Sequence, residues 1–335
     1  MKIAIIGAGA IGSVVAAYLN KAGQDVTLIG RQDQVDAINK AGLKIKGVRG
    51  EEIFKIKAQT VLDQEYDLVV FTTKTQDLEE AYRANALFLK NSLILSSQNG
   101  VQSDHILKQW FKPEQMLSSI VMFGSTYIKP GEIIFNFEGD WIVGKPFTAN
   151  DQKLQDVVAV LKKAFSVSVS ENIIGMKWLK LFINFNNCIP ATIGKSMQET
   201  FADMDLCRLS ILLFKEGVAI VQKAGIELVS LPQFPKERIL GLANMPLDQA
   251  AGIIDKTLTS LSKEPLYGSI LQSIMRGRES EIDYINGEVV RLAKQTNLEA
   301  PLNEKIVSLV HEVEKKQKFF DPAYINEVFS LGANK

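Results

Sequence analysis

Three polar residues in the middle of the chain lie at spacings that could bring them together for chemistry. Lys180, Asn184 and Asn187 follow one another by four and three residues, which predicts one shared face of a helix. Their neighbours, such as Trp178 and Phe182, are apolar. An ammonium group and two amides are costly to bury without partners, so the pattern favours a ligand-lining face over a solvated one. A buried lysine also has a lowered pKa, which suits proton donation to a carbonyl oxygen.

A second candidate, at the start of the chain, is a glycine-rich turn that follows a short β-branched strand. The turn reads Gly7-Ala8-Gly9-Ala10-Ile11-Gly12 and precedes a helical pattern. In this spacing the first glycine permits a tight turn, the second admits a pyrophosphate, and the third lets helix and strand pack closely. The helix N-terminus offers N–H groups to the phosphates. The context predicts dinucleotide binding, with a purely structural turn as the alternative.

The end of the second expected strand bears on the choice of dinucleotide. This strand covers Asp25 to Ile29 and is followed by Gly30 and Arg31, where an NAD-binding protein usually carries an acidic residue for the ribose 2′-hydroxyl. An arginine suits a 2′-phosphate instead, so Arg31 favours NADPH/NADP⁺ over NAD. The alternative is that Arg31 is a solvated loop charge.

Two further polar segments follow expected strands. Thr72-Thr73-Lys74 comes after one strand, and Ser97-Gln98-Asn99-Gly100 comes after the next. Because ligands of open α/β sheets bind beyond the carboxyl ends of the strands, Lys74 and Asn99 are candidate ligand contacts. The alternatives are a solvated lysine and an ordinary Asn-Gly turn.

Ser269 and Glu281 form a more distant candidate pair near the C-terminus. On one continuous helix they would lie about 18 Å apart, so they can share a site only if the helix breaks. Gly277 is the expected place for that break. The alternative is that Glu281 belongs to an exposed charged face together with Glu279 and Asp283.

The elements that must position these residues fall into two groups. Up to residue 172, buried strands alternate with helices, which predicts an α/β fold with a mostly parallel, doubly wound sheet. Residues 43–46 and 53–58 are expected to form a hairpin. The stretch 117–144 is expected to finish the sheet with antiparallel strands. From residue 173 onward the pattern is all-helical, with breaks that include Pro190.

Composition excludes several function classes. The 38 Lys and Arg residues balance the 38 Asp and Glu residues, which argues against a nucleic-acid binder. No apolar run approaches the length of a membrane span or a secretory signal, so a cytoplasmic protein without membrane association is expected. The cysteines, Cys188 and Cys207, and the histidines, His105 and His311, show no metal-ligand spacing, so no metal site is expected.

Taken together, these residues resemble the ketopantoate reductase (2-dehydropantoate 2-reductase) family along nearly the whole chain. The matching segments are Gly7 to Gly12, Arg31, Thr72-Thr73-Lys74, Gln98-Asn99-Gly100, Trp178 with Lys180-Leu181 and Asn184, Ser269 to Gln272, and Glu281-Ile282-Asp283-Tyr284-Ile285-Asn286-Gly287. The Lys-x₃-Asn helix combined with the Glu281 motif is the most specific part.

The resemblance implies two domains and a set of roles. Residues 1–172 would form a Rossmann-type, NADP-binding domain, and residues 173–335 an all-helical substrate and dimerisation domain. NADPH would reduce ketopantoate to pantoate, on the route to pantothenate and coenzyme A. Whether the protein forms a homodimer is left open.

By the same resemblance, the catalytic residues would be Lys180, as general acid and carbonyl polariser, and Glu281, which would bind the substrate hydroxyl. Ser269 would bind its carboxylate. Asn99 and Asn184 would orient Lys180 and the substrate, and Lys74 and Arg31 would hold the cofactor.

Two positions depart from the family pattern in the substrate half. Cys188 stands where the family has a second asparagine, and Asn187 could supply that amide if the turn before Pro190 is shortened. Ser273 replaces an aspartate. A paralogue that reduces another branched or bulky 2-keto acid is therefore the alternative function, and a non-catalytic NADP-binding sensor is a third.

Overall fold

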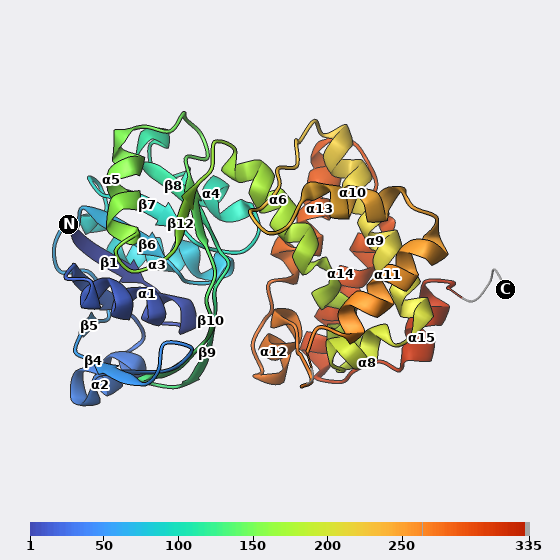
Figure 1. The fold of residues 1–335 in the computed structure, drawn as a ribbon, viewed down its shortest axis with the longest axis horizontal. Coiled ribbons are helices and arrows are strands. Elements are labelled where there is room, and N and C mark those ends of the chain that lie inside the picture. The colour runs from blue at the N-terminus through green and yellow to red at the C-terminus, as the bar shows by residue number, and fades with distance from the viewer. Residues whose placement is uncertain (263, 332–335) are drawn as a thin grey trace. The chain divides into compact units, whose positions relative to one another are not determined.

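The computed structural model describes residues 1–262 and 264–331 and divides the chain into two compact units. The first unit is Met1–Ile174 and the second is Gly175–Lys335. Figure 1 shows that the first contains the β-sheets and that the second is built from helices. Among the described residues, none of the helices combines the length and apolar character that a bilayer crossing requires.

The main sheet of the first unit has eight strands in the order β12-β11-β8-β7-β6-β1-β2-β5. All neighbouring pairs are parallel except β8 and β11. The strands are β1 (Lys2–Ile6), β2 (Asp25–Ile29), β5 (Lys57–Gln59), β6 (Leu68–Phe71), β7 (Leu93–Ser96), β8 (Met116–Val121), β11 (Trp141–Gly144) and β12 (Val167–Val169). The mostly parallel sheet predicted from the sequence is therefore confirmed.

A second, four-stranded sheet was not predicted. Its order is β4-β3-β10-β9, with β3 (Leu43–Gly47), β4 (Glu52–Phe54), β9 (Gly124–Lys129) and β10 (Glu132–Phe137). The expectation that residues 117–144 finish the main sheet is wrong for β9 and β10. The expected hairpin is present in β3 and β4, but β5 leaves it to pair with β2.

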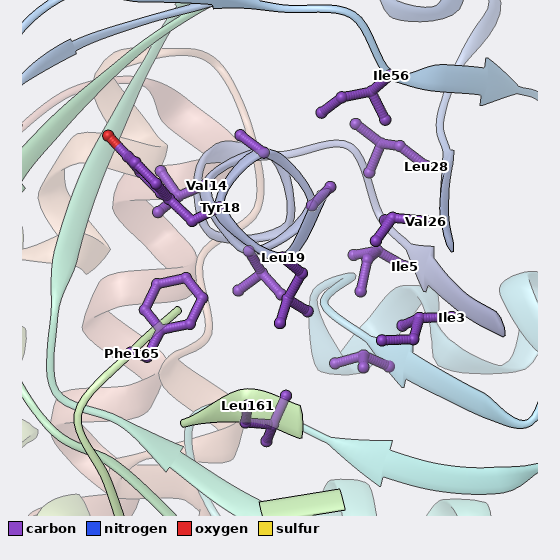
Figure 2. Close-up of a cluster of buried hydrophobic side chains, with 14 of the residues drawn as sticks. Ile3, Ile5, Val14, Tyr18, Leu19, Val26, Leu28, Ile56, Leu161 and Phe165 are labelled. Atoms are coloured by element: carbon purple, nitrogen blue, oxygen red, sulfur yellow. The ribbon is translucent and has the colours of Figure 1, made fainter. Parts of the chain in front are cut away.

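Alternating side chains explain how both sheets pack. On β1, Ile3 and Ile5 face one core cluster while Ala4 and Ile6 face another. The first cluster includes residues of α1 and α5. Figure 2 shows Leu19 of α1 in this cluster with Ile3 and Ile5, and Val14 beside Tyr18 on another side of the helix. The first unit's helices are α1 (Ala10–Lys21), α2 (Gln32–Ala41), α3 (Leu78–Asn85), α4 (Gln102–Leu107) and α5 (Gln152–Leu161).

The second sheet joins the same core through aromatic contacts. Tyr18 of α1 lies 5.4 Å from Phe54 and 5.7 Å from Phe135, measured between ring centroids. Phe165, after α5, packs on Tyr18 as well (Figure 2). These aromatic contacts therefore hold the four-stranded sheet against α1, the helix that follows the glycine-rich turn.

The second unit is helical, as predicted, and within its described residues the sole β-type pairing is an isolated bridge between Leu231 and Phe234. Its α-helices are α6 (Ile173–Asn184), which begins just before the unit, α7 (Cys188–Ile193), α8 (Met197–Phe201), α9 (Met204–Lys223), α10 (Lys236–Asn244), α11 (Leu247–Thr259), α12 (Ser269–Met275), α13 (Asn286–Gln295), α14 (Pro301–Lys316) and α15 (Pro322–Val328). The long α9 contacts α8, α10, α11, α13 and α14 and forms the centre of the unit.

The predicted break lies a few residues before Pro190, because α6 ends at Asn184 and α7 begins at Cys188. Pro190 is the third residue of α7 and is buried. A proline is tolerated in the first helical turn because its missing N–H would have no acceptor within the helix there.

Candidate functional site

The glycine-rich turn between β1 and α1 is packed too closely for side chains at two of its glycines. Gly7 has a φ of 119°, and a Cβ on it would lie 2.6 Å from the Thr73 backbone nitrogen. A Cβ on Gly12 would overlap the Gly7 carbonyl oxygen and the Thr72 hydroxyl. Gly7 and Gly12 are therefore required by the packing of the turn against the end of β6.

Gly9 differs from these two glycines. A Cβ on Gly9 would meet no described atom within 4 Å, so the fold itself does not require a glycine there. Gly9 is the N-cap of α1, no side chain caps this helix end, and its first turn carries no acidic residue. Open space in front of uncapped amides fits the close approach of a phosphate.

The turn also packs against the end of β2. A Cβ on Gly30 would lie 2.5 Å from the Cβ of Ala8, so Gly30 lets the turn close on this strand. Arg31 follows as the N-cap of α2, with an exposed side chain that forms no ion pair with the described residues. A guanidinium therefore stands beside the turn and is accessible to an anion.

The ends of β6 and β7 are joined by side-chain hydrogen bonds. The Thr72 hydroxyl donates to the Gly7 carbonyl oxygen over 2.8 Å. The Gln98 amide nitrogen donates to the carbonyl oxygens of Phe71, over 2.9 Å, and Thr73, over 3.1 Å. Thr72 and Gln98 thus have structural functions that the sequence motifs did not assign to them.

Polar atoms without protein partners lie in these same segments. The buried Gln98 Oε1 and Thr73 Oγ1 have no hydrogen-bond partner among the described residues. Lys74, which is partly buried, comes directly after Thr73. Because buried polar groups are normally satisfied, these atoms are suited to contact a polar ligand at this edge of the sheet.

Asn99 is held by a turn whose flanks are anchored. Gly100 has a φ of 78° and follows Asn99, which is partly buried. The fully buried carboxylate of Asp104 accepts hydrogen bonds from the hydroxyls of Ser96 and, over 2.7 Å, of Ser118. Asp104 therefore fixes α4 to the strands on either side of the Asn99 turn, a function that no sequence motif indicated.

In the second unit, the apolar face of α6 is fixed by aromatic packing. Phe182 of α6 and Phe185, which directly follows α6, lie 6.2 and 5.8 Å from Phe214 of α9, measured between ring centroids. A Cβ on Gly217 would come within 2.9 Å of the Phe182 ring, so this glycine lets α6 and α9 approach closely. The packing fixes the orientation of α6, which carries Lys180 and Asn184.

Lys180 has an unusual electrostatic environment. Burial lowers its pKa to about 8, and the neighbouring charge of Lys177 acts in the same direction. The carboxylate of Glu281 opposes this shift, so the fold brings Glu281 into electrostatic range of Lys180. Both side chains are partly exposed. An amine that is mostly protonated at neutral pH and close to losing its proton is suited to general acid catalysis.

Asn184 and Asn187 do not share one continuous α-helix, contrary to the prediction. Helix α6 ends at Asn184, and Asn187 belongs to a tighter 3₁₀ turn, η4 (Phe185–Asn187). A Cβ on Gly268 would lie 2.9 Å from Asn187 Cγ, so the amide of Asn187 packs directly against Gly268. Ser269, the first residue of α12, follows Gly268. The fold therefore brings Asn187 beside the Ser269 segment.

Cys188 lies in the core. It is fully buried, and burial raises the pKa of its thiol to about 12, against a smaller opposing effect of the Asn286 side chain. Asn286, also fully buried, donates to Asn303 Oδ1 over 3.1 Å. Cys188, which departs from the family pattern, is therefore an unreactive buried thiol that interacts with the side chain of Asn286.

Ser269 and Glu281 are separated by a helix break at the expected position. Helix α12 ends at Met275, and Gly277 adopts a left-handed φ of 63° while its N–H donates to the Ile274 carbonyl oxygen. Glu281 immediately precedes a short 3₁₀ helix, η5 (Ile282–Tyr284). The break removes the separation that a continuous helix would impose.

Known proteins resemble the chain over nearly its full length. The family described as "Ketopantoate reductase PanE/ApbA" matches residues 3–146, and its C-terminal counterpart matches residues 172–314. A 2-dehydropantoate 2-reductase from Pyrococcus abyssi is 34% identical over 92% of this chain and 97% of its own.

Two solved structures extend the comparison. A PanE/ApbA family ketopantoate reductase from Ralstonia eutropha is 27% identical, with a TM-score of 0.80 over 95% of this chain and 99% of its own. D-mandelate dehydrogenase, solved with NADH and anilino(oxo)acetate, is 23% identical, with a TM-score of 0.80 over 94% of this chain and 99% of its own. The family matches and the Pyrococcus relative show that the chain is an oxidoreductase that belongs to the ketopantoate reductase family.

Proposed function

We propose that this protein reduces 2-dehydropantoate (ketopantoate) to pantoate with NADPH. The observation that carries the proposal is Lys180, whose pKa is lowered to about 8 beside the charge of Glu281. A proton donor within electrostatic range of a carboxylate is the combination that reduction of a hydroxylated 2-keto acid calls for. The Pyrococcus abyssi relative bears the name of this activity.

The residues of the first unit fit the cofactor. The turn from Gly7 to Gly12 would hold the pyrophosphate at the N-terminus of α1, and Arg31 would pair with the 2′-phosphate. Lys74 and Asn99 would contact the cofactor at the ends of β6 and β7, where Gln98 and Thr73 leave polar atoms unpaired. When bound, NADPH supplies the hydride. The competing choice is NADH, which is present in the D-mandelate dehydrogenase structure.

Lys180 would act on the carbonyl oxygen of the substrate. With a pKa of about 8, the amine is mostly protonated at neutral pH. Its positive charge would stabilise the negative charge that develops on the oxygen during reduction, and its proton would then pass to that oxygen. The low pKa makes this transfer easier than from an ordinary surface lysine.

The remaining side chains of the second unit would orient the substrate. Glu281 would accept a hydrogen bond from the substrate hydroxyl, and Ser269 would donate to the carboxylate. Asn184, at the end of α6, would orient Lys180 and the substrate. Asn187 would replace the family's second asparagine, because the 3₁₀ turn buries Cys188 and leaves Asn187 partly exposed beside Gly268.

A second candidate function is the reduction of another branched or bulky 2-keto acid. The observation that favours it is Cys188, which stands in the core where the family has an asparagine, so that no amide reaches the substrate from this position. The D-mandelate dehydrogenase fold shows that this architecture serves other substrates. A non-catalytic sensor is disfavoured, since dinucleotide sensing requires neither Lys180 nor Glu281.

One assay separates these functions. Initial rates of NADPH oxidation are measured against a panel of 2-keto acids that includes ketopantoate, and the best substrate is repeated with NADH. The proposal expects the highest kcat/KM with ketopantoate and NADPH. A higher value with an aromatic or unhydroxylated keto acid would establish the paralogue function. Cofactor binding without turnover of any keto acid would support the sensor.

A further inference from the structure

The segment that carries Glu281 is tied to α14 on both sides of this residue. The Ser280 backbone N–H, immediately before Glu281, donates to Glu314 Oε1 over 2.7 Å. His311 contacts Asp283 Oδ1 through Nε2 and Glu314 Oε2 through Nδ1, each over 3.0 Å. We call this set, formed by Ser280, Asp283, His311 and Glu314, the α14 clamp.

The clamp has a buried part and a surface part. Ser280 is 6% exposed, and the Glu314 side chain is 12% exposed. The side chains of His311 and Asp283 are 45% and 55% exposed. The hydrogen bond between Ser280 and Glu314 is thus shielded from solvent, whereas the second link through His311 is accessible to protons from water.

The chain around Glu281 needs such support. Gly277 is in a left-handed conformation, residues 278–280 form no regular secondary structure, and η5 spans only three residues. A short 3₁₀ helix has poor hydrogen-bond geometry and cannot by itself fix the direction of a side chain. Contacts to the long helix α14 supply the rigidity that this segment lacks.

We propose that His311 and Glu314 are positioning residues that hold Glu281 in the orientation in which it recognises the hydroxyl group of the substrate. This inference rests on the proposed function, because it concerns the same substrate contact. It adds two residues on α14 that none of the sequence motifs includes. Neither residue contacts the substrate in this proposal, and both act through the segment that carries Glu281.

The chemistry of the imidazole makes the clamp dependent on pH. Both ring nitrogens of His311 face carboxylates, and both can donate only when the ring is protonated. Burial lowers the pKa of His311, but hydrogen bonds and negative charges from Asp283 of η5 and Glu314 of α14 outweigh it and raise the pKa. These two carboxylates are the charged groups that act on the ring. At low pH the protonated ring of His311 therefore keeps both contacts of the clamp. As the pH rises through the raised pKa of His311, one of these contacts is lost.

The first test measures substrate discrimination. The ratio of kcat/KM for ketopantoate to that for 2-keto-3-methylbutyrate, which lacks the hydroxyl, is determined for wild type, Glu314→Ala and His311→Gln. Both substrates need the proton of Lys180, so its titration cancels in the ratio. We expect the ratio to fall about threefold to tenfold in both variants, with the kcat for 2-keto-3-methylbutyrate nearly unchanged.

Conservative and control variants separate positioning from stability. Glu314→Gln keeps an acceptor for the Ser280 N–H and should recover part of the ratio. Glu312→Gln removes a surface ion pair with Lys316 of the same helix, over 2.6 Å, and should leave the ratio unchanged.

The pH dependence of the same ratio tests His311. The wild-type ratio should decrease between pH 6 and 9, while that of His311→Gln stays flat. Equal losses with both substrates would overturn the proposal.

A second test does not depend on turnover. The carboxylate of Glu281 raises the pKa of Lys180, so displacement of Glu281 should lower that pKa. The titration is followed by the ¹³Cε resonance of labelled lysine, assigned with Lys180→Arg. Glu314→Ala should titrate at lower pH than wild type, and Glu312→Gln should not.

The two tests distinguish the two ways in which the inference could fail. If wild type does not prefer the hydroxylated keto acid, the proposed substrate is wrong. The Lys180 titration alone then tests whether the clamp positions Glu281. An unchanged Lys180 titration in Glu314→Ala would overturn the clamp even if ketopantoate is the substrate.

Discussion

The glycine-rich turn of the first unit and the polar site of the second unit are built in opposite ways. The turn offers backbone N–H groups, and it is shaped by the absence of side chains at Gly7, Gly12 and Gly30. The site in the second unit offers side chains, led by Lys180 and Glu281, which come from segments far apart in the sequence.

The difference determines how each site responds to substitution. At the turn, the backbone that packs against the strands is also the backbone that would contact the cofactor, so substitutions at Gly7 and Gly12 should disturb packing first. In the second unit, Lys180 and Glu281 are partly exposed. Aromatic packing of Phe182 on Phe214 holds the helix of Lys180, and hydrogen bonds to α14 hold the segment of Glu281. Their truncation should therefore alter chemistry while the fold remains.

The largest effect is expected for Lys180→Ala. A general acid contributes about 10² to 10⁴ in rate, and loss of the charge at the carbonyl oxygen adds to this. We expect kcat/KM to fall by at least about 10², with NADPH binding and folding nearly intact. Lys223→Ala, an exposed lysine at the end of α9, is the control. Turnover above roughly a tenth of wild type would show that another group donates the proton.

Two glycines of the same turn test the first half of the comparison. Gly12→Ala places a Cβ on the Gly7 carbonyl oxygen and should destabilise the protein by about 1–3 kcal/mol or more, measured by denaturant unfolding. Gly9→Ala meets no described atom and should leave stability within about 0.5 kcal/mol while weakening NADPH binding. Unchanged NADPH affinity in Gly9→Ala would mean that no phosphate approaches this residue.

Local patterns were sufficient for much of the first unit. The bounds of β1 and β2 and the strand–turn–helix order follow from short apolar runs and from glycine spacing. The second sheet could not be predicted, because its central pair joins β3 to β10 in parallel, and these two strands are separated in the sequence by residues 48–131, which include other strands and helices. No local signal specifies such a distant pairing. Residues 117–144 look like successive hairpins of one sheet until tertiary packing separates them.

For the site in the second unit, residue types were easier to predict than geometry. The sequence indicated Lys180 through its spacing on an apolar helix and Glu281 through the family resemblance, and it placed the helix break at Gly277. It could not show that the helix tightens before Cys188, because a 3₁₀ turn and an α-helix share the same apolar pattern. His311 looked isolated because its partners are Asp283, from another element, and Glu314.

Arg31→Ala tests whether a side chain contributes to cofactor binding beside the glycine-rich turn, which offers backbone N–H groups. If Arg31 pairs with the 2′-phosphate, its loss should cost about 1.5–3 kcal/mol, or roughly 10- to 150-fold in the NADPH dissociation constant. The NADH dissociation constant should change little. Lys40→Ala, near the other end of α2, controls for general charge. Equal weakening of both cofactors would contradict the assignment.

Glu281→Ala tests the side-chain site at its most specific contact. A carboxylate that accepts from the substrate hydroxyl is left unpaired by an analogue without it, which gives strong discrimination. Wild type should favour ketopantoate over 2-keto-3-methylbutyrate by more than about tenfold in kcat/KM, and Glu281→Ala should bring the ratio toward one. A wild-type preference that survives the substitution would show that another residue recognises the hydroxyl.

The smallest effect concerns the pH dependence of catalysis, where the two units should differ without any substitution. The Lys180 pKa is lowered to about 8, so its protonated, proton-donating form is present below that pH and is lost as the pH rises through it. Activity at low substrate concentration should therefore be halved near pH 8 and fall about tenfold for each further pH unit. NADPH binding should show no transition at this pH, because the groups that would hold the cofactor do not include Lys180. Direct titration of NADPH at pH 7 and pH 9, beside kcat/KM profiles, checks both halves. A flat kcat/KM profile between pH 7 and 9 would mean that proton transfer from Lys180 does not limit the reaction, and a parallel loss of NADPH affinity would place the titrating group at the cofactor instead.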